Sequence, residues 1–299
     1  MKNKISAFLT VLAMLNLGIL APETAHAAPA LFLTAPSAVL LDSQNHIIYA
    51  KTPHLRRAPA STTKLLTAIV AYEHLDLNDI VTIPGYVAYV EPSKIYLKPG
   101  EKYRARELLR AALINSANDA AETLAVAAGG TRHHFVELMN AKAKALGCSG
   151  SHFVNPTGLP AAYQYSTAYD LALIMRELEK YPFLIQTLRT RTLIIKNSAG
   201  RKIFLRNHNK MLWRSKNEVI GKTGWTRAAR HCFVGQIQAF GKTVFVSMLG
   251  SHRLWTDLKL LAEYPFGMSW ISRKVHDKYS ARKSKKVSAH RTTYKKIKR

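Results

Sequence analysis

Three short motifs, far apart along the chain, most constrain how it can fold. They are Ser61–Lys64 (Ser-Thr-Thr-Lys), Ser116–Asn118 (Ser-Ala-Asn) and Lys222–Gly224 (Lys-Thr-Gly). Together they supply a hydroxyl beside a lysine, a polar bridge, and a cation next to a backbone edge. An acyl-transfer enzyme needs these parts when lysine, in place of histidine, accepts the serine proton. A fold that uses them must bring three distant segments to one place.

The first motif lies where a helix is expected to begin. Pro59 precedes it, and apolar residues recur at helical spacing after it, so the helix should begin near Ser61. Ser61 and Lys64 would then share one face, and the helix N-terminus would favour negative charge that develops there. Lys64 must be neutral to accept a proton. Burial and a second cation both lower a lysine pKa, and Lys222 is the candidate for that cation.

The other two motifs are predicted to hold the substrate. Ser116 and Asn118 can relay a proton and hold an amide. A strand that carries Lys222–Gly224 can pair edge-on with an extended peptide, because its glycine allows close approach. The backbone N–H groups of Ser61 and Trp225 are then expected to form an oxyanion hole.

Each motif is weak evidence when taken alone. A second Ser-x-x-Lys occurs at Ser280–Lys283, and Ser-x-Asn recurs at Ser43–Asn45 and Ser215–Asn217. Ser61 alone would be interpreted as an ordinary helix start with a solvated lysine. The joint pattern favours a catalytic site, because one motif begins a helix, one lies between helices and one lies on a strand.

Hydrophobic periodicity places strands at both ends of the chain and helices between them. The predicted strands are 38–41, 47–51, 192–196, 202–205, 219–225, 231–239 and 243–249. The predicted helices after the first are 107–114, 119–128, 134–146, 167–180 and 255–263, with a structured loop at Asn155–Pro160. This order predicts an α+β fold whose sheet is assembled from the chain ends, with a helical subdomain inserted at about 78–182.

The N-terminus has the features of a secretory signal peptide. Lys2 and Lys4 precede an apolar run, and Ala25–Ala27 gives a small-x-small cleavage pattern. We expect a signal peptide at 1–27 and a mature protein that acts outside the cytoplasm, and an uncleaved membrane anchor is the alternative. Two cysteines, Cys148 and Cys232, are too few for a disulfide scaffold, although they could still pair.

The net charge of +26 is unevenly distributed, with a short basic segment at the C-terminus. The segment 271–299 holds 12 Lys or Arg residues and one acid, Asp277, and has few large apolar residues. We expect 28–267 to form the catalytic domain and 268–299 to be a disordered basic tail. The tail either solubilises the protein or adheres to an anionic wall or membrane surface. Nucleic acid is a poor fit for an exported chain, and no metal or cofactor motif is present in the sequence.

The sequence segments around the three motifs resemble those of low-molecular-mass penicillin-binding proteins, the serine D-Ala-D-Ala carboxypeptidases. The similar stretches are Ala60–Ala68, Leu97–Glu101, Ser116–Ala121, Phe153–Leu159 and Tyr165–Asp170. They extend the resemblance from about Pro36 to Tyr264. It implies a β-lactamase/DD-peptidase-like α/β fold, an antiparallel sheet flanked by helices.

The resemblance also implies a role for each motif residue. Ser61 would be the acylated nucleophile, Lys64 the base, and Ser116 and Asn118 the second motif. Substrate-carboxylate binding is implied for Lys222, Thr223 and, by its position after the last strand, Arg253. The implied substrate is the peptidoglycan stem peptide that ends in D-Ala-D-Ala, and β-lactam antibiotics would acylate the same serine. No cofactor is implied.

Two departures from the family and three alternatives remain. The basic tail takes the place of a second β-rich domain and amphipathic helix, and Ala228–Arg230 replaces a small-residue pair.

A D,D-endopeptidase that cuts crosslinks would use the same chemistry. A class A β-lactamase is disfavoured because Asn155–Lys180 contains no Glu-x-x-Leu-Asn string. A non-catalytic wall-binding protein with the same fold is the third alternative.

Overall fold

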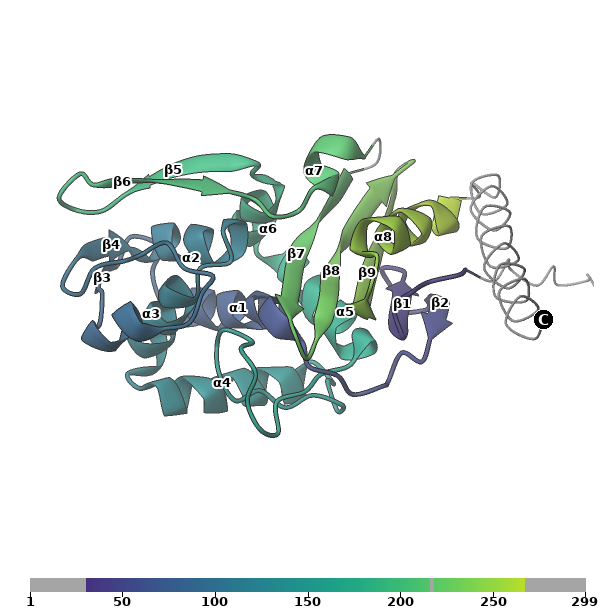
Figure 1. Ribbon diagram of the computed structural model, residues 1–299, viewed down its shortest axis with the longest axis horizontal. Helices are drawn as coiled ribbons and strands as arrows, with labels where there is room; N and C mark the ends of the chain where they lie inside the picture. The colour runs from purple at the N-terminus through teal and green to yellow at the C-terminus, as the bar shows by residue number, and fades with distance from the viewer. Residues whose placement is uncertain (1–30, 216–217, 267–299) are drawn as a thin grey trace, which may run out of the picture. The chain divides into compact units, whose positions relative to one another are not determined.

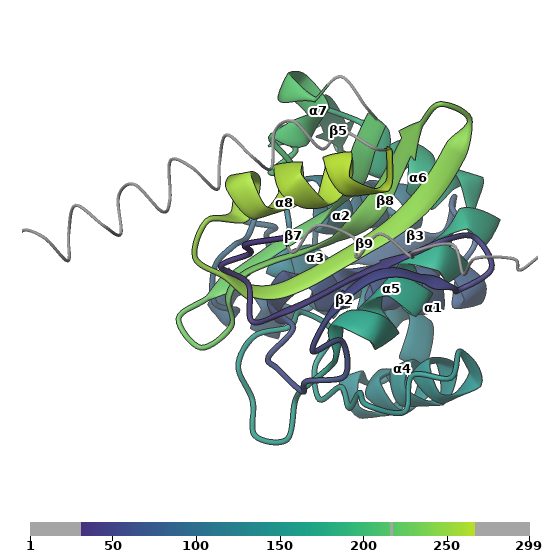
Figure 2. The same ribbon diagram turned by 90° about the vertical axis from the view of Figure 1, so that its right-hand side faces the viewer.

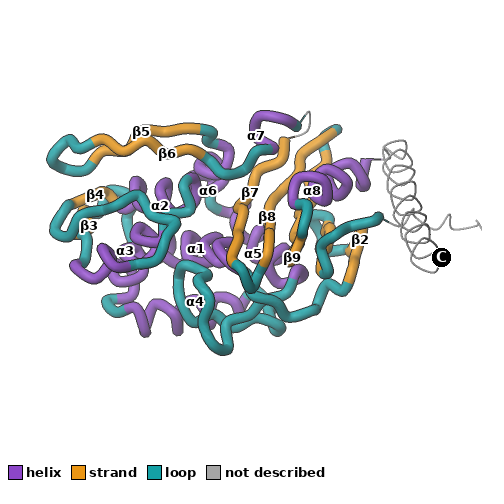
Figure 3. The backbone as a smooth tube through the Cα atoms, in the orientation of Figure 1, coloured by secondary structure: helices purple, strands orange, loops and turns teal. Residues whose placement is uncertain are grey.

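One five-stranded sheet is built from the two ends of the chain. The computed structural model describes residues 31–215 and 218–266. The strand order is β2-β1-β9-β8-β7, and every neighbouring pair is antiparallel. The strands are β1 (Ser37–Leu41), β2 (Ile47–Lys51), β7 (Glu218–Thr226), β8 (Arg230–Ala239) and β9 (Lys242–Ser251). The predicted sheet from chain ends is therefore confirmed (Figures 1 and 3).

Helices cover both faces of this sheet. Alternate residues of β1 point to opposite sides: Ala38 and Leu40 join an apolar cluster with α8 (Leu254–Glu263), whereas Val39 and Leu41 join the main core. On that second face α5 (Ala168–Glu177) packs against β1, β8 and β9. The sheet is thus the middle of three layers, with α8 on one side (Figure 2).

The middle of the chain supplies the main helical layer. The central helix α1 (Lys64–His74) packs against α2 (Ala105–Ile114), α3 (Asn118–Gly129) and α4 (Arg132–Ala145). The predicted helices are confirmed. The subdomain boundary at 78–182 stays a prediction, and the segment includes α5, which packs on the sheet.

Two small sheets lie beside the helices. The predicted strands 192–196 and 202–205 are confirmed as a hairpin of β5 (Thr192–Lys196) and β6 (Lys202–Arg206), which packs on α2. A second pair, β3 (Ile80–Thr82) and β4 (Lys102–Arg104), was not predicted, because three residues are too few to show a strand period. Also not predicted were α6 (Pro182–Arg189), α7 (Met211–Arg214) and the 3-10 turns η2 (Gly85–Tyr89) and η4 (Tyr264–Phe266). The 3-10 turn η3 (Leu178–Lys180) forms the end of the helix predicted over 167–180.

Several predictions about the chain ends fall outside the described residues. These are the signal peptide at 1–27 and the basic tail at 268–299. Among residues 31–215 and 218–266, no helix combines the length and apolar character needed to cross a membrane. Cys148 and Cys232 are both buried and free.

Candidate active site

The nucleophile segment folds as a short turn that leads into α1. Ser61 lies in the 3-10 turn η1 (Ala60–Thr63), and the α-helix itself begins at Lys64. The predicted helix start near Ser61 is therefore shifted by three residues. The two side chains still share a face, with 3.0 Å between Lys64 Nζ and Ser61 Oγ. The tight turn thus keeps the spacing that the proton transfer needs.

Lys64 is fully buried and surrounded by oxygen atoms. Its Nζ donates to Asn118 Oδ1 at 2.6 Å and to the carbonyl oxygen of Thr157 at 2.7 Å. Burial, followed by repulsion from the Lys222 ammonium, holds the pKa of Lys64 well below its ordinary value. A neutral amine has two N–H donors and one lone pair. The two carbonyl-type oxygens match those donors, which leaves the lone pair for the Ser61 hydroxyl.

The second motif connects α2 to α3 and fixes the direction of the Asn118 amide. Ser116 has a φ of 60°, a conformation that non-glycine residues rarely adopt and that often occurs at functional sites. Asn118 Nδ2 donates to the carbonyl oxygen of Glu91 at 2.8 Å, and the Asn118 backbone N–H donates to that of Ser93 at 2.7 Å. With its nitrogen held in this way, the Asn118 amide must present Oδ1 to Lys64.

The third motif lies on β7, the edge strand of the main sheet beside η1. Lys222 is buried, and its Nζ donates to Ser116 Oγ and to the carbonyl oxygen of Thr223, both at 2.9 Å. Burial lowers the pKa of Lys222 to about 7. A Cβ atom at Gly224 would stand 3.0 Å from the backbone nitrogen of Ser61. This position therefore needs glycine so that β7 can approach the nucleophile closely.

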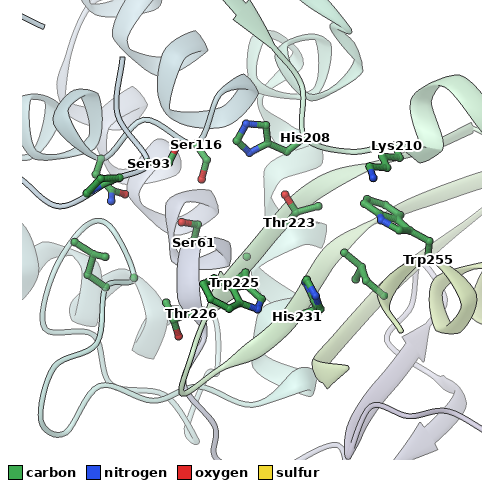
Figure 4. A pocket seen from close by; sticks show the side chains of 16 residues that line it. Ser61, Ser93, Ser116, His208, Lys210, Thr223, Trp225, Thr226, His231 and Trp255 are labelled. Atoms are coloured by element: carbon green, nitrogen blue, oxygen red, sulfur yellow. The ribbon is translucent and has the colours of Figure 1, made fainter. Parts of the chain in front are cut away.

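A pocket of about 360 Å³ opens over these residues. Figure 4 shows Ser61 in its middle, with Ser93 and Ser116 on one side and Thr223 on the other. The sequence-predicted residues that line it are Ser61, Ser116, Asn118, Thr223, Gly224 and Trp225. Lys64 and Lys222 are buried behind this lining. The structure thus brings together eight of the nine predicted site residues.

Arg253 is the predicted residue that does not line the pocket. It is exposed at the position before α8, and its backbone N–H donates to Thr34 Oγ1 at 3.1 Å and Ser251 Oγ at 3.0 Å. Its neighbours Leu254 and Trp255 do line the pocket. A carboxylate-binding role for Arg253 stays a prediction.

The structured loop predicted at Asn155–Pro160 supplies the second oxygen to Lys64, a role that motif reasoning missed. Asn155 Oδ1 accepts hydrogen bonds from the backbone N–H of Thr157 at 3.2 Å and of Gly158 at 2.8 Å, and these bonds fix the loop. A backbone carbonyl leaves no residue-type signature in a sequence. The available signal was the Phe153–Leu159 stretch, which resembles the family without revealing a role. His208, Lys210 and Trp255, which also line the pocket, were missed as well.

Gly158→Ala is expected to lower the free energy of unfolding by at least about 2 kcal/mol. Gly158 has a φ of 79°, and a Cβ there would stand 1.8 Å from the carbonyl oxygen of Ala60, next to the nucleophile. Urea unfolding measures this loss of stability. Gly147→Ala is the matched control, because Gly147 has the same φ of 79° with nothing within 4 Å of its Cβ position. If both substitutions lowered the free energy of unfolding equally, the contact between the added Cβ and the carbonyl oxygen of Ala60 would not be the cause.

Among the described residues, no group of three or more His, Cys, Asp or Glu side chains is placed to hold a metal ion. The chemical groups that converge on the pocket are hydroxyls, amines and amides. They suit acyl transfer to a serine.

Comparison with known proteins identifies the family that shares this arrangement. The sequence profile of peptidase family S11, D-alanyl-D-alanine carboxypeptidase, matches residues 23–252. The chain belongs to this family. The D-alanyl-D-alanine carboxypeptidases of the family are serine hydrolases, and the family membership and fold that the motifs predicted are confirmed.

Individual relatives agree with the family assignment. The chain is 35% identical over 204 residues to D-alanyl-D-alanine carboxypeptidase DacF of Bacillus subtilis, a match that covers 66% of this chain and 52% of that protein. The chain thus spans about half the length of DacF. It is 31% identical over 243 residues to the D-alanyl-D-alanine endopeptidase of Escherichia coli, with coverage of 75% and 78%. The solved D-alanyl-D-alanine carboxypeptidase of Mycobacterium tuberculosis superposes with a TM-score of 0.77 at 30% identity, over 82% of this chain and 95% of that one.

Proposed function

We propose that the chain removes the terminal D-alanine from peptidoglycan stem peptides through an acyl-enzyme on Ser61. Family membership supports peptidoglycan peptides as substrates and β-lactams as inhibitors. The observation that carries the proposal is the 3.0 Å contact between Ser61 Oγ and the buried Lys64 amine. A serine hydroxyl is a weak nucleophile until a neighbouring base accepts its proton.

Acylation begins when Ser61 Oγ attacks the carbonyl carbon of the penultimate D-alanine. The hydroxyl proton passes to the lone pair of Lys64 Nζ, and a tetrahedral oxyanion forms. The C–N bond then breaks, and the proton held by Lys64 Nζ passes through Ser116 Oγ to the nitrogen of the leaving D-alanine, so that Lys64 is neutral again. Water next attacks the ester carbonyl carbon while Lys64 accepts a proton from it. The bond to Ser61 Oγ then breaks and Lys64 returns the proton to this oxygen, which frees the tetrapeptide and restores Ser61.

Backbone and side-chain donors from β7 position the substrate in this scheme. The N–H groups of Ser61 and Trp225 bind the oxyanion, a role supported by the close approach of Gly224 to the Ser61 nitrogen. Thr223 and the Lys222 cation hold the terminal carboxylate. The free edge of β7 pairs with the extended peptide.

The size of the pocket favours a second candidate activity, D,D-endopeptidase cleavage of crosslinks. If Thr223 holds the terminal carboxylate, the leaving group lies on the same side of Ser61 as Thr223. The pocket continues there to Lys210 and Trp255, whereas D-alanine carries only a methyl group (Figure 4). A crosslinked leaving group, which carries the rest of a second peptide, would fill this end. Purified crosslinked and uncrosslinked muropeptides distinguish the two activities by the products released.

The carboxypeptidase proposal is tested by two assays on the full chain. A fluorescent penicillin should label the protein, mass spectrometry should locate the adduct on the peptide that contains Ser61, and a synthetic pentapeptide should lose its last D-alanine. Labelling with no release from the pentapeptide or from crosslinked muropeptides would indicate a penicillin-binding wall protein without peptidase activity. An adduct at another serine would refute the assignment of Ser61.

The two buried lysines predict a bell-shaped pH dependence of kcat/KM. The rising limb follows deprotonation of Lys64, whose pKa is well below its ordinary value. Lys222, with its pKa lowered to about 7, loses its cation as the pH rises, and carboxylate binding weakens. We expect kcat/KM to fall above this pKa by about tenfold per pH unit. Lys222→Gln should be less active and lack the falling limb, and a limb that persists in this variant would assign it to another group.

We further propose that the protein is exported and acts outside the cytoplasm. The support is the signal-peptide pattern at 1–27 together with a family that acts on peptidoglycan. The 12 cations of 271–299 would then hold it to an anionic wall or membrane surface at low salt. Deletion of 271–299 should release the protein from such fractions. Unchanged partitioning would refute the adhesive role of the tail.

A further inference from the structure

The outward face of the β5–β6 hairpin is an exposed surface of cations and apolar side chains. The register pairs Ile194 with Phe204 and Lys196 with Lys202 on this face. Ile194 is 56% exposed and Phe204 is 61% exposed, and both lysines are exposed. Arg206 follows on the same face of β6. Together with Trp213 of α7, these five side chains are here called the hairpin platform.

The pleat of the hairpin fixes which side chains face solvent. The alternate residues Ile195 and Leu205 are buried in the main core against the helical layer, so the platform residues must point outward. An apolar pair that stays this exposed loses the stabilisation of burial. The fold therefore presents Ile194 and Phe204 to solvent without using them in its own packing.

The charges of the platform are unbalanced. Lys196 and Lys202 stand directly opposite each other across the two strands, an arrangement in which like charges destabilise a sheet. Within residues 31–215 and 218–266, no acidic side chain forms an ion pair with either lysine. The acids near the hairpin are already engaged, Glu101 by Arg201 and Glu218 by Arg189. An external anion would relieve this repulsion.

The platform is continuous with the catalytic pocket. The Arg206 guanidinium lies over the Trp213 ring, 5.8 Å from its centroid, so the cationic and aromatic surface extends onto α7. Two residues beyond Arg206 the chain reaches His208 and then Lys210, which line the pocket. Figure 1 shows the hairpin above α2, leading away from α7 and β7. A polymer bound along the hairpin would reach the pocket at its end.

We propose that the hairpin platform binds the peptide-bearing glycan strand of peptidoglycan, outside the pocket that takes the scissile peptide. Lys196, Lys202 and Arg206 pair with stem-peptide carboxylates, and the exposed rings of Phe204 and Trp213 pack on the apolar faces of sugars. Peptidoglycan combines both chemistries in one polymer. This inference extends the proposed function, because it concerns the polymer that carries the substrate and involves no residue of the catalytic site.

The test measures the affinity of the full chain for purified insoluble peptidoglycan by co-sedimentation. All proteins carry Ser61→Ala, so the polymer stays intact and the result does not depend on the proposed catalytic roles. The hairpin variant is Lys196→Gln/Lys202→Gln/Phe204→Thr. Its matched control, Lys144→Gln/Lys242→Gln/Ile47→Thr, removes two exposed lysines and one strand residue that is 50% exposed, all outside the hairpin. The C-terminal segment is the same in every protein, so its contribution to binding cancels in the comparison.

We expect the hairpin variant to bind peptidoglycan about tenfold more weakly than the control, with an unchanged thermal unfolding midpoint. Vesicles that contain anionic phospholipid provide a second arm, in which the two variants should bind alike. Equal affinities for peptidoglycan would overturn the proposal. So would a selective loss of vesicle binding, which would identify the partner as a membrane, or a lowered unfolding midpoint that accounts for the loss.

Discussion

Ser61→Ala is expected to eliminate covalent labelling by penicillin and to lower kcat/KM on a D-Ala-D-Ala peptide by a factor on the order of 10⁵ to 10⁶. The substitution removes the oxygen that forms the acyl bond, and it leaves the buried Lys64–Asn118–Thr157 contacts in place. Stopped-flow labelling and D-alanine release give the two rates.

The chain provides its own matched control for this result. Ser280→Ala removes the serine of the second Ser-x-x-Lys string, at Ser280–Lys283, and should leave both rates unchanged. If Ser280→Ala lost labelling and Ser61→Ala kept it, the nucleophile would lie in the C-terminal segment, and the proposed mechanism would be wrong.

Lys64→Met is expected to slow acylation of Ser61 by a factor of about 10² to 10⁴, the usual contribution of a general base. Methionine nearly fills the volume of the buried stem and offers no strong proton acceptor. Penicillin should still bind reversibly, because Thr223, Gly224 and Trp225 remain in the pocket lining. The measurement separates the dissociation constant of the reversible complex from the first-order rate of acylation.

The comparison variant for Lys64→Met is Lys222→Met. Lys222 is also fully buried, so both variants bury a similar apolar side chain in place of an amine. We expect Lys222→Met to act mainly on the dissociation constant, since its proposed role is to bind the carboxylate. A Lys64→Met protein that acylates at the wild-type rate would exclude Lys64 as the base.

Much of this fold could be predicted because its elements are long and regular. The helix after Ser61 shows a clear hydrophobic period, and the order of the three motifs along the chain predicted that they meet in one site. Family resemblance then supplied roles that residue types alone left open. Motif spacing did not predict the 3-10 turn at Ala60–Thr63, because a 3-10 turn and a helix N-terminus use the same residues there.

The unpredicted parts of the site come from backbone atoms and from distant packing. Nothing in the residue types shows that the carbonyl of Thr157 faces Lys64, since any residue could supply that oxygen. His208 and Lys210 reach the pocket because the chain turns between β6 and α7, an arrangement that local patterns do not encode. The role of Arg253 stays a prediction: its place in sequence matches the family, and its neighbours Leu254 and Trp255 line the pocket.

The protonation state of Lys64 decides whether the serine hydroxyl has a base beside it. It can be followed in the full chain by NMR after biosynthetic labelling of lysine with ¹³C at Cε, with the Lys64 signal identified by its absence in Lys64→Met. The account predicts that this signal titrates far below the value of about 10.4 for a solvated lysine. A titration at or above about 10.4 would show a cation next to Ser61 at neutral pH, and the proposed proton transfer would be impossible.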